Sequence, residues 1–121
     1  QYRFGNRNMS LEIPGGMADP GEDPKEAAIR ELYEETGYES SNVIEIGKVL
    51  PNPALMANYT FTYLALESKQ TGMQQLDGME DIEITEVPLE KIPSFIDEGK
   101  IEHSLVISAF YFLDRYNANN V

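Results

Sequence analysis

Three glutamates, Glu31, Glu34 and Glu35, are spaced so that a helix would place them on one face. At separations of three and four residues their Cβ atoms would lie about 6 Å apart, close enough for the like charges to repel. Such a run is ordinarily a solvated acidic face. The glycine-rich stretch before it and the spacing favour a second interpretation, because hard divalent cations such as Mg²⁺ or Mn²⁺ require oxygen ligands. The glutamates therefore predict a metal site.

The helix that must position these glutamates has clear start and stop signals. Asp23 is a good helix N-cap, and Pro24 suits the first helical position. Apolar residues continue at helical spacing, and Gly37 can adopt the left-handed conformation that ends a helix. We therefore predict a helix over Pro24–Thr36.

The glutamates belong to a longer pattern that starts at a glycine and ends at another glycine. Its fixed residues here are Gly16, Glu22, Arg30, Glu31, Leu32, Glu34, Glu35 and Gly37. This pattern resembles the Nudix box, the signature of metal-dependent hydrolases that cut nucleoside diphosphates linked to another group. Only Tyr38 differs, because the family usually has an aliphatic residue at that position.

The resemblance implies roles for the box residues. It implies two or three Mg²⁺ or Mn²⁺ ions held by the Gly15 carbonyl, Glu31, Glu34 and Glu35. Arg30 has two interpretations. It could be an ordinary i, i+4 partner of Glu34, or, as in the family, it could reach Glu22 and pin the loop against the helix. We favour the second interpretation.

Weaker features outside the box resemble the ADP-ribose and nucleotide-sugar pyrophosphatases of this family. They are Gln1-Tyr2-Arg3, the entry to the box at Leu11–Gly16, Pro53, the acidic stretch Glu80–Glu83, Val87-Pro88-Leu89 and Gly99-Lys100-Ile101. In those relatives a strand arginine meets the substrate phosphates, which implies substrate binding by Arg3. An acidic residue in the loop before Ile82 serves there as general base, and a second one can contact metal. The resemblance implies Glu80 as the catalytic base and as a metal ligand.

The identity of the base stays open at this point. Gly78 stands where relatives can hold a base, so the competing candidates are Glu80, Asp77, Asp81 and a box glutamate, Glu34 or Glu35. As ordinary residues, positions 77–83 would form a solvated loop and strand edge.

The resemblance implies hydrolysis of the diphosphate of ADP-ribose or a nucleotide sugar, giving a nucleoside monophosphate and a sugar phosphate. One alternative is hydrolysis of nucleoside triphosphates or dinucleoside polyphosphates. Another is a sensor module that binds a nucleotide without cutting it. Such modules commonly lose box carboxylates, and all of them are present here, so we predict an enzyme.

Length and charge agree with a small enzyme. The chain has 121 residues, 41% of them hydrophobic, which suits a single domain over 1–121. A net charge of −12 repels nucleic acid and anionic lipid, so we expect neither as a partner. A small diphosphate substrate would need bridging cations, which the predicted metal site supplies. The absence of cysteine fits a cytoplasmic location.

The first residues resemble the middle of a family strand. The start at Gln1 therefore indicates that N-terminal strands of the family fold are missing. This subfamily often pairs through its N-terminal region, so a homodimer is a further expectation.

Hydrophobic patterning predicts a mixed α+β protein, which suits the Nudix fold, an α/β/α sandwich with a mixed β-sheet packed between helices. The expected strands are Gln1–Phe4, Ser10–Ile13, Val43–Leu50, Asn58–Glu67 and Ile82–Val87, and the later helices are Pro93–Glu98 and Glu102–Asn117. We interpret His103, the only histidine, as a capping or surface residue. The alternating aromatics Tyr59, Phe61 and Tyr63 are interpreted as core.

Overall fold

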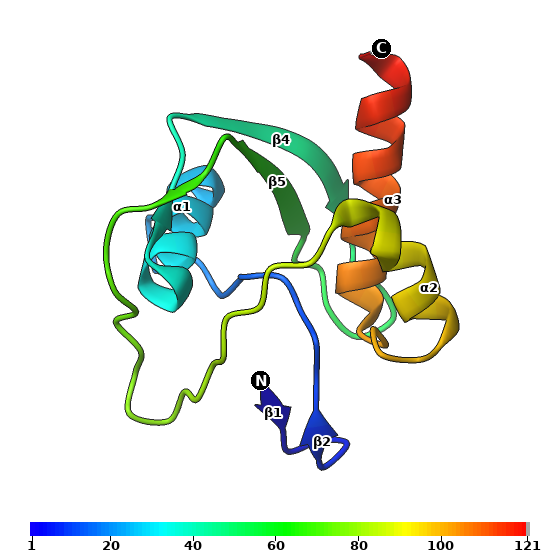
Figure 1. Cartoon of the computed structure of the whole chain (residues 1–121), viewed down its shortest axis with the longest axis horizontal. Coiled ribbons are helices and arrows are strands. Elements are labelled where there is room, and N and C mark those ends of the chain that lie inside the picture. The colour runs from blue at the N-terminus through cyan, green and yellow to red at the C-terminus, as the bar shows by residue number, and fades with distance from the viewer. Residues whose placement is uncertain (121) are drawn as a thin grey trace.

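The computed structural model describes residues 1–120 and contains helices together with short strands (Figure 1). The elements in chain order are β1 Tyr2–Arg3, β2 Asn8–Met9, α1 Pro24–Thr36, β3 Tyr38–Glu39, β4 Asn42–Val49, β5 Thr60–Leu66, β6 Lys69–Gln70, the 3-10 helix η1 Leu89–Lys91, α2 Ile92–Asp97 and α3 Ser104–Asn119. The predicted α+β class is confirmed.

The central layer is the antiparallel pair β4–β5, which lies between α1 and α3 and contacts both (Figure 1). Its register runs from Asn42 opposite Leu66 to Val49 opposite Thr60, with an irregularity between Glu45 and Gly47. At Gly47 a side chain would overlap the ring of Phe112, so this glycine lets α3 approach the strand closely. The layers are therefore helix, strands, helix, as predicted.

The strands form three two-stranded antiparallel ladders across residues 1–120, β1–β2, β3–β6 and β4–β5, instead of one mixed sheet. The strand predicted for Ser10–Ile13 is wrong, because the first hairpin already ends where the backbones of Gln1 and Ser10 exchange hydrogen bonds. The strand predicted for Ile82–Val87 is also wrong. The carbonyl of Ile82 accepts a hydrogen bond from the Gln74 side chain instead of from a neighbouring strand.

The main core cluster joins α2, α3 and the segments before them. Ile92, Ile101 and Val106 are buried there, and Leu11, Val87, Phe95, Ile96 and Phe110 pack against them. Gly99, with φ of +75°, turns the chain between the two helices. The side chain of His103 accepts the Leu105 N–H at 3.1 Å and caps α3, which confirms its interpretation as a capping residue.

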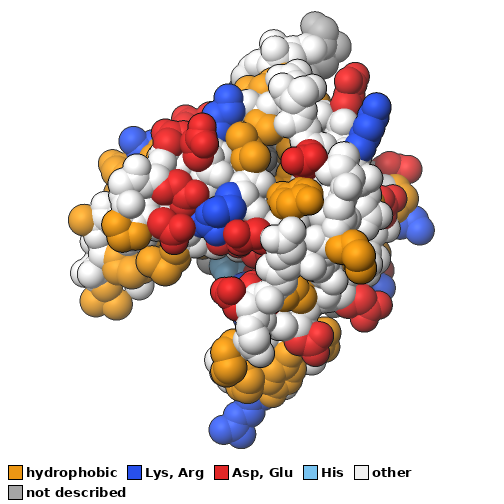
Figure 2. Space-filling model, turned by 90° about the vertical axis from the view of Figure 1, so that its left-hand side faces the viewer, with side chains coloured by type: hydrophobic (Ala, Val, Ile, Leu, Met, Phe, Trp, Pro, Cys, Tyr) orange, Lys and Arg blue, Asp and Glu red, His pale blue; other side chains and the backbone are white. Residues whose placement is uncertain are grey.

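The chain exposes more surface than a compact monomer of its size. Its accessible surface is 8732 Å², against roughly 6,600 Å² for a compact protein of this mass. The β1–β2 hairpin projects from the body, and Figure 2 shows acidic side chains gathered over the face that carries α1. Tyr59, predicted to be core, is 48% exposed, whereas Phe61 and Tyr63 are half-buried. Across residues 1–120 we find no helix that combines the length and apolar character needed to cross a bilayer.

Candidate active site

The site is organised by α1, whose two ends are fixed as the sequence predicts. The Asp23 carboxylate accepts the backbone N–H groups of Lys25 and Glu26 at 3.1 and 3.4 Å. At the other end Gly37 has φ of +75°, and its N–H donates to the Tyr33 carbonyl at 2.7 Å. These caps satisfy backbone groups that a helix leaves without partners. The predicted bounds Pro24–Thr36 are confirmed.

Arg30 makes both of the contacts that the sequence leaves open. Its Nε and Nη2 donate to the two carboxylate oxygens of Glu22 at 2.9 and 3.0 Å. Its Nη1 donates to Glu31 and Glu34, each at 3.1 Å. Because Glu22 also accepts the Asp19 N–H at 2.8 Å, the bidentate pair holds the loop before α1 against the helix. The Arg30 guanidinium, followed by the Asp19 N–H, lowers the pKa of Glu22 to about 2.

Glu35 is the most unusual carboxyl group of the site. It is only 8% exposed, and its Oε2 accepts the Gly15 N–H at 3.3 Å. Burial, followed by a hydrogen bond with Glu31, raises the pKa of Glu35 to about 8. The pKa of a carboxyl group is raised in this way when its charged form is shielded from solvent and faces another carboxylate. The group therefore favours either a proton or a cation.

The glycine loop packs directly on these carboxylates. A Cβ at Gly16 would overlap the carboxylate of Glu31, so the glycine lets the loop backbone lie directly against this side chain in its present position. The structure thus brings Gly15, Gly16, Glu31 and Glu35 together. Glu34 lies beside them and pairs with Arg30.

The oxygen donors fit a hard cation, but their present contacts involve Arg30. Within residues 1–120 no three acidic or histidine side chains are arranged around one ion position, and Arg30 pairs with both Glu31 and Glu34. Glu35, hydrogen-bonded to Glu31 beside a glycine backbone, still has the chemistry that Mg²⁺ or Mn²⁺ requires. Metal ligation by the whole set needs Glu31 and Glu34 to turn away from Arg30.

Glu80 lies in the loop that follows β6 and is half-buried. Its carboxylate accepts the Asp77 N–H at 3.0 Å, and its own N–H donates to the Asp77 carbonyl at 2.9 Å. The negative charge of Glu80 contributes to the raised pKa of Glu35, so the two groups interact. Asp77 and Asp81 are exposed.

Arg3 has a partner that sequence reasoning missed. Its Nε and Nη2 donate to the Glu12 carboxylate at 2.7 and 2.5 Å. The guanidinium lowers the pKa of Glu12, and the hydrogen bond to Glu12, with a smaller contribution from Glu35, raises the pKa of Arg3. Arg3 therefore lies within electrostatic reach of the box. Glu12 lies in the entry to the box, and no spacing pattern in the sequence links it to Arg3.

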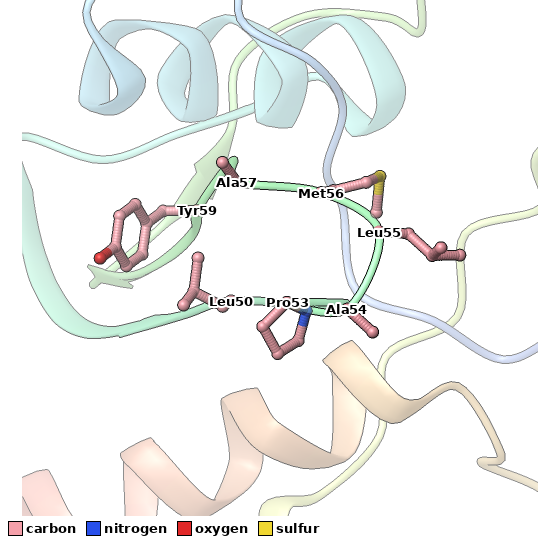
Figure 3. A pocket seen from close by; sticks show the side chains of 7 residues that line it. All are labelled: Leu50, Pro53, Ala54, Leu55, Met56, Ala57 and Tyr59. Atoms are coloured by element: carbon pink, nitrogen blue, oxygen red, sulfur yellow. The ribbon is translucent and has the colours of Figure 1, made fainter.

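Two hollows accompany these groups. An open cavity of about 520 Å³ lies inside the β4–β5 loop, and Figure 3 shows its lining, which includes Leu50, Pro53, Met56 and Tyr59. The box carboxylates do not line it, although Pro53 was one of the outer features of the sequence. A smaller groove of about 150 Å³ is lined by Glu12, Pro14, Glu35 and the extended residues 82–85. Of these two hollows, the smaller is the one lined by a box carboxylate, Glu35.

Fold and site together define a small α/β/α domain in which the buried Glu35 and the partly buried Glu31 lie at a glycine loop. The NUDIX domain family model matches residues 1–110, and the chain belongs to the Nudix hydrolase family, as the box predicts.

Named relatives share this domain. The chain is 32% identical over 119 residues to the methanol dehydrogenase activator of Bacillus methanolicus, covering 98% of the chain and 64% of that protein. It is 30% identical over 114 residues to the ADP-ribose pyrophosphatase of Bacillus subtilis (strain 168), covering 93% of the chain and 62% of that protein. It is 34% identical over 102 residues to the ADP-ribose pyrophosphatase of Saccharomyces cerevisiae, covering 77% of the chain and 42% of that protein.

A solved structure shows the same fold. A crystal structure of an ADP compounds hydrolase matches with a TM-score of 0.83 and 23% identity, covering 99% of the chain and 64% of that structure. The chain therefore spans less than two thirds of the length of these relatives.

Proposed function

We propose that this domain hydrolyses the diphosphate linkage of ADP-ribose or a nucleotide sugar, with Mg²⁺ or Mn²⁺ as cofactor. The observation that carries the proposal is the buried Glu35 carboxyl group, which is hydrogen-bonded to Glu31 and lies against the glycine loop. A group in this setting gains most from a bound cation, which removes both the repulsion and the cost of burial. The two relatives named ADP-ribose pyrophosphatase support the substrate class.

The proposed ligands of two or three ions are the Gly15 carbonyl, Glu31, Glu34, Glu35 and Glu80. When bound, such ions neutralise the diphosphate and lower the pKa of a water molecule. Glu22 holds Arg30 by two hydrogen bonds, so it retains the guanidinium when Glu31 and Glu34 turn toward an ion. Glu22 and Arg30 thus have a structural role.

Side chains of the domain then accept the proton of the attacking water and bind the substrate. Water attacks phosphorus, the bond between phosphorus and the bridging oxygen breaks, and a carboxylate accepts the proton of the water. We assign this proton to Glu80, with Asp77, Asp81 and the box glutamates Glu34 and Glu35 as the alternatives to be tested. Arg3 binds a substrate phosphate through N–H groups beyond the two that Glu12 accepts.

The test is a substrate panel with Mg²⁺ or Mn²⁺, followed by product analysis. It contains ADP-ribose, GDP-mannose, UDP-glucose, diadenosine polyphosphates and nucleoside triphosphates. We expect a nucleoside monophosphate and a sugar phosphate from one of the first three compounds. Turnover of only the diadenosine polyphosphates or nucleoside triphosphates would refute the proposed substrate class. Binding without turnover would indicate a sensor.

Point variants test the residues. Glu35→Gln should lower turnover at least about 100-fold, because it removes a charged ligand, while the fold is retained. Glu26→Gln, an exposed change on the same helix, is the matched control and should retain the wild-type rate. Normal activity of Glu35→Gln would refute the metal assignment. Glu80→Gln and Asp77→Asn, measured separately, decide the base.

We also propose a homodimer. Its support is the β1–β2 hairpin, where Tyr2, Phe4 and Met9 are 42%, 79% and 60% exposed. Burial of such side chains between copies is favourable. Sedimentation equilibrium of the wild type and of Phe4→Ser tests this, and a monomeric wild type at high concentration would refute it.

A further inference from the structure

Residues 71–75, just after β6, wrap around the C-terminal end of α1. The last carbonyl groups of a helix have no hydrogen-bond donors within the helix, and here this segment supplies the donors. The N–H of Gln75 donates to the Glu34 carbonyl at 2.7 Å, and the N–H groups of Thr71 and Gly72 donate to the Gly37 carbonyl at 2.9 and 3.1 Å.

Gln74 makes the central contact of this segment. Its Nε2 donates to the backbone carbonyl of Glu35 and to that of Ile82, both at 2.9 Å. A side-chain amide has two N–H donors, so both are used. One carbonyl belongs to a proposed metal ligand on α1. The other lies directly after the acidic loop 77–81.

The acidic loop is therefore held at both of its ends. Before it, the backbone of Gln75 is bonded to Glu34, and after it, Ile82 is bonded to Gln74. Between these points, Asp77 and Glu80 exchange hydrogen bonds with each other. Both ends of the loop are therefore bonded, directly or through Gln74, to backbone carbonyl groups of α1.

We propose that Gln74 is a positioning residue for the reaction, because its side-chain amide holds the acidic loop 77–81 beside Glu35. The inference rests on the proposed hydrolase function and adds to it a residue outside the box. A general base must lie within hydrogen-bonding reach of the water it activates, and a displacement of about 1 Å can cost about 100-fold in rate. Gln74 sets that placement without touching the substrate.

The experiment compares Gln74→Met, which keeps the side-chain length and removes both donors, with Gln75→Met as matched control. The control is suitable because Gln75 is exposed and its recorded bond uses only the backbone. With the substrate that the wild type cleaves, Gln74→Met should lower kcat by about 10- to 100-fold. KM should stay close to the wild-type value, whereas Mg²⁺ affinity should fall, because the displaced loop carries Glu80, a proposed ligand. Gln74→Lys, which restores N–H donors, should recover part of the loss.

A second readout needs no activity. Hydrogen exchange of the metal-free protein should become faster at the Asp77 and Glu80 amides in Gln74→Met and stay unchanged in Gln75→Met. Amides of β4 and β5 should keep their protection in both variants.

Three results would overturn the inference: unchanged exchange in residues 77–80, an equal loss of kcat in Gln75→Met, or faster exchange throughout β4 and β5. If the wild type cleaves no compound in the panel, the proposed function fails. The exchange measurement still decides whether Gln74 holds the loop.

Discussion

The raised pKa of Glu35 predicts how the stability of the metal-free protein depends on pH. The folded protein keeps a proton on Glu35 up to pH about 8, whereas the group in the unfolded chain loses it near its ordinary pKa of 4.5. Between these values the folded state binds more protons than the unfolded state. The free energy of unfolding must therefore fall as pH rises through this range.

The size of the effect follows from the same two values. A pKa of about 8 against 4.5 corresponds to at most about 5 kcal/mol. Solvent in the adjoining groove screens the group and reduces this figure, so we expect a loss of about 2 kcal/mol between pH 5 and pH 8. Excess Mg²⁺ should restore stability at pH 8, because it binds the deprotonated carboxylates of the folded state only.

The assay is urea unfolding in EDTA at pH 5, 6, 7 and 8, for the wild type, Glu35→Gln and Asp114→Asn. Glu35→Gln should flatten the dependence, since an amide does not titrate. Asp114→Asn, an exposed change on α3, should keep the wild-type slope. A wild-type stability that is constant or rises from pH 5 to pH 8 would refute the reasoning, as would an unchanged slope in Glu35→Gln.

Three further predictions concern the loop, the helix end and the histidine. Gly16→Ala should weaken Mg²⁺ binding by about 10-fold in calorimetry, because the new Cβ displaces the flexible Glu31 carboxylate, and should change the melting temperature little. Gly37→Ala should destabilise the protein by about 2 kcal/mol or more in urea unfolding, because φ is +75° and the Cβ would overlap the Gly72 backbone. His103→Ala should cost about 1 kcal/mol by loss of the α3 cap and leave kcat unchanged.

These predictions have their own controls. Gly5→Ala places its Cβ in open space and should leave Mg²⁺ binding unchanged, so an equal effect there would contradict the reasoning for Gly16. A fully stable Gly37→Ala would show that the helix end can rearrange. A large loss of kcat in His103→Ala, with the fold retained, would make His103 part of the chemistry.

The local elements could be read from the chain because their signals are local. The N-cap, the proline after it and the stopping glycine of α1 lie within one helix, and the two later helices were predicted to within two residues at either end. The strands predicted at Ser10–Ile13 and Ile82–Val87 do not form, because a strand needs a partner strand and the sequence does not show which backbone groups remain available. Hydrophobic patterning shows that a segment can be extended. Whether it pairs with another strand depends on which backbone groups are already hydrogen-bonded.

The same division runs through the site. The sequence alone determined the family and the carboxylates of the box, because these residues lie within one loop and one helix. The structure showed that Arg30 contacts Glu22 as well as Glu31 and Glu34. Only the tertiary structure decided that Glu12 pairs with Arg3, and that Gln74 joins the end of α1 to the acidic loop. The Gln74–Glu35 contact connects residues 39 positions apart in the chain, and the Arg3–Glu12 pair belongs to no spacing pattern that the sequence shows. The raised pKa of Glu35 is also a tertiary effect. Its largest cause is burial, and burial results from packing that the local sequence does not show.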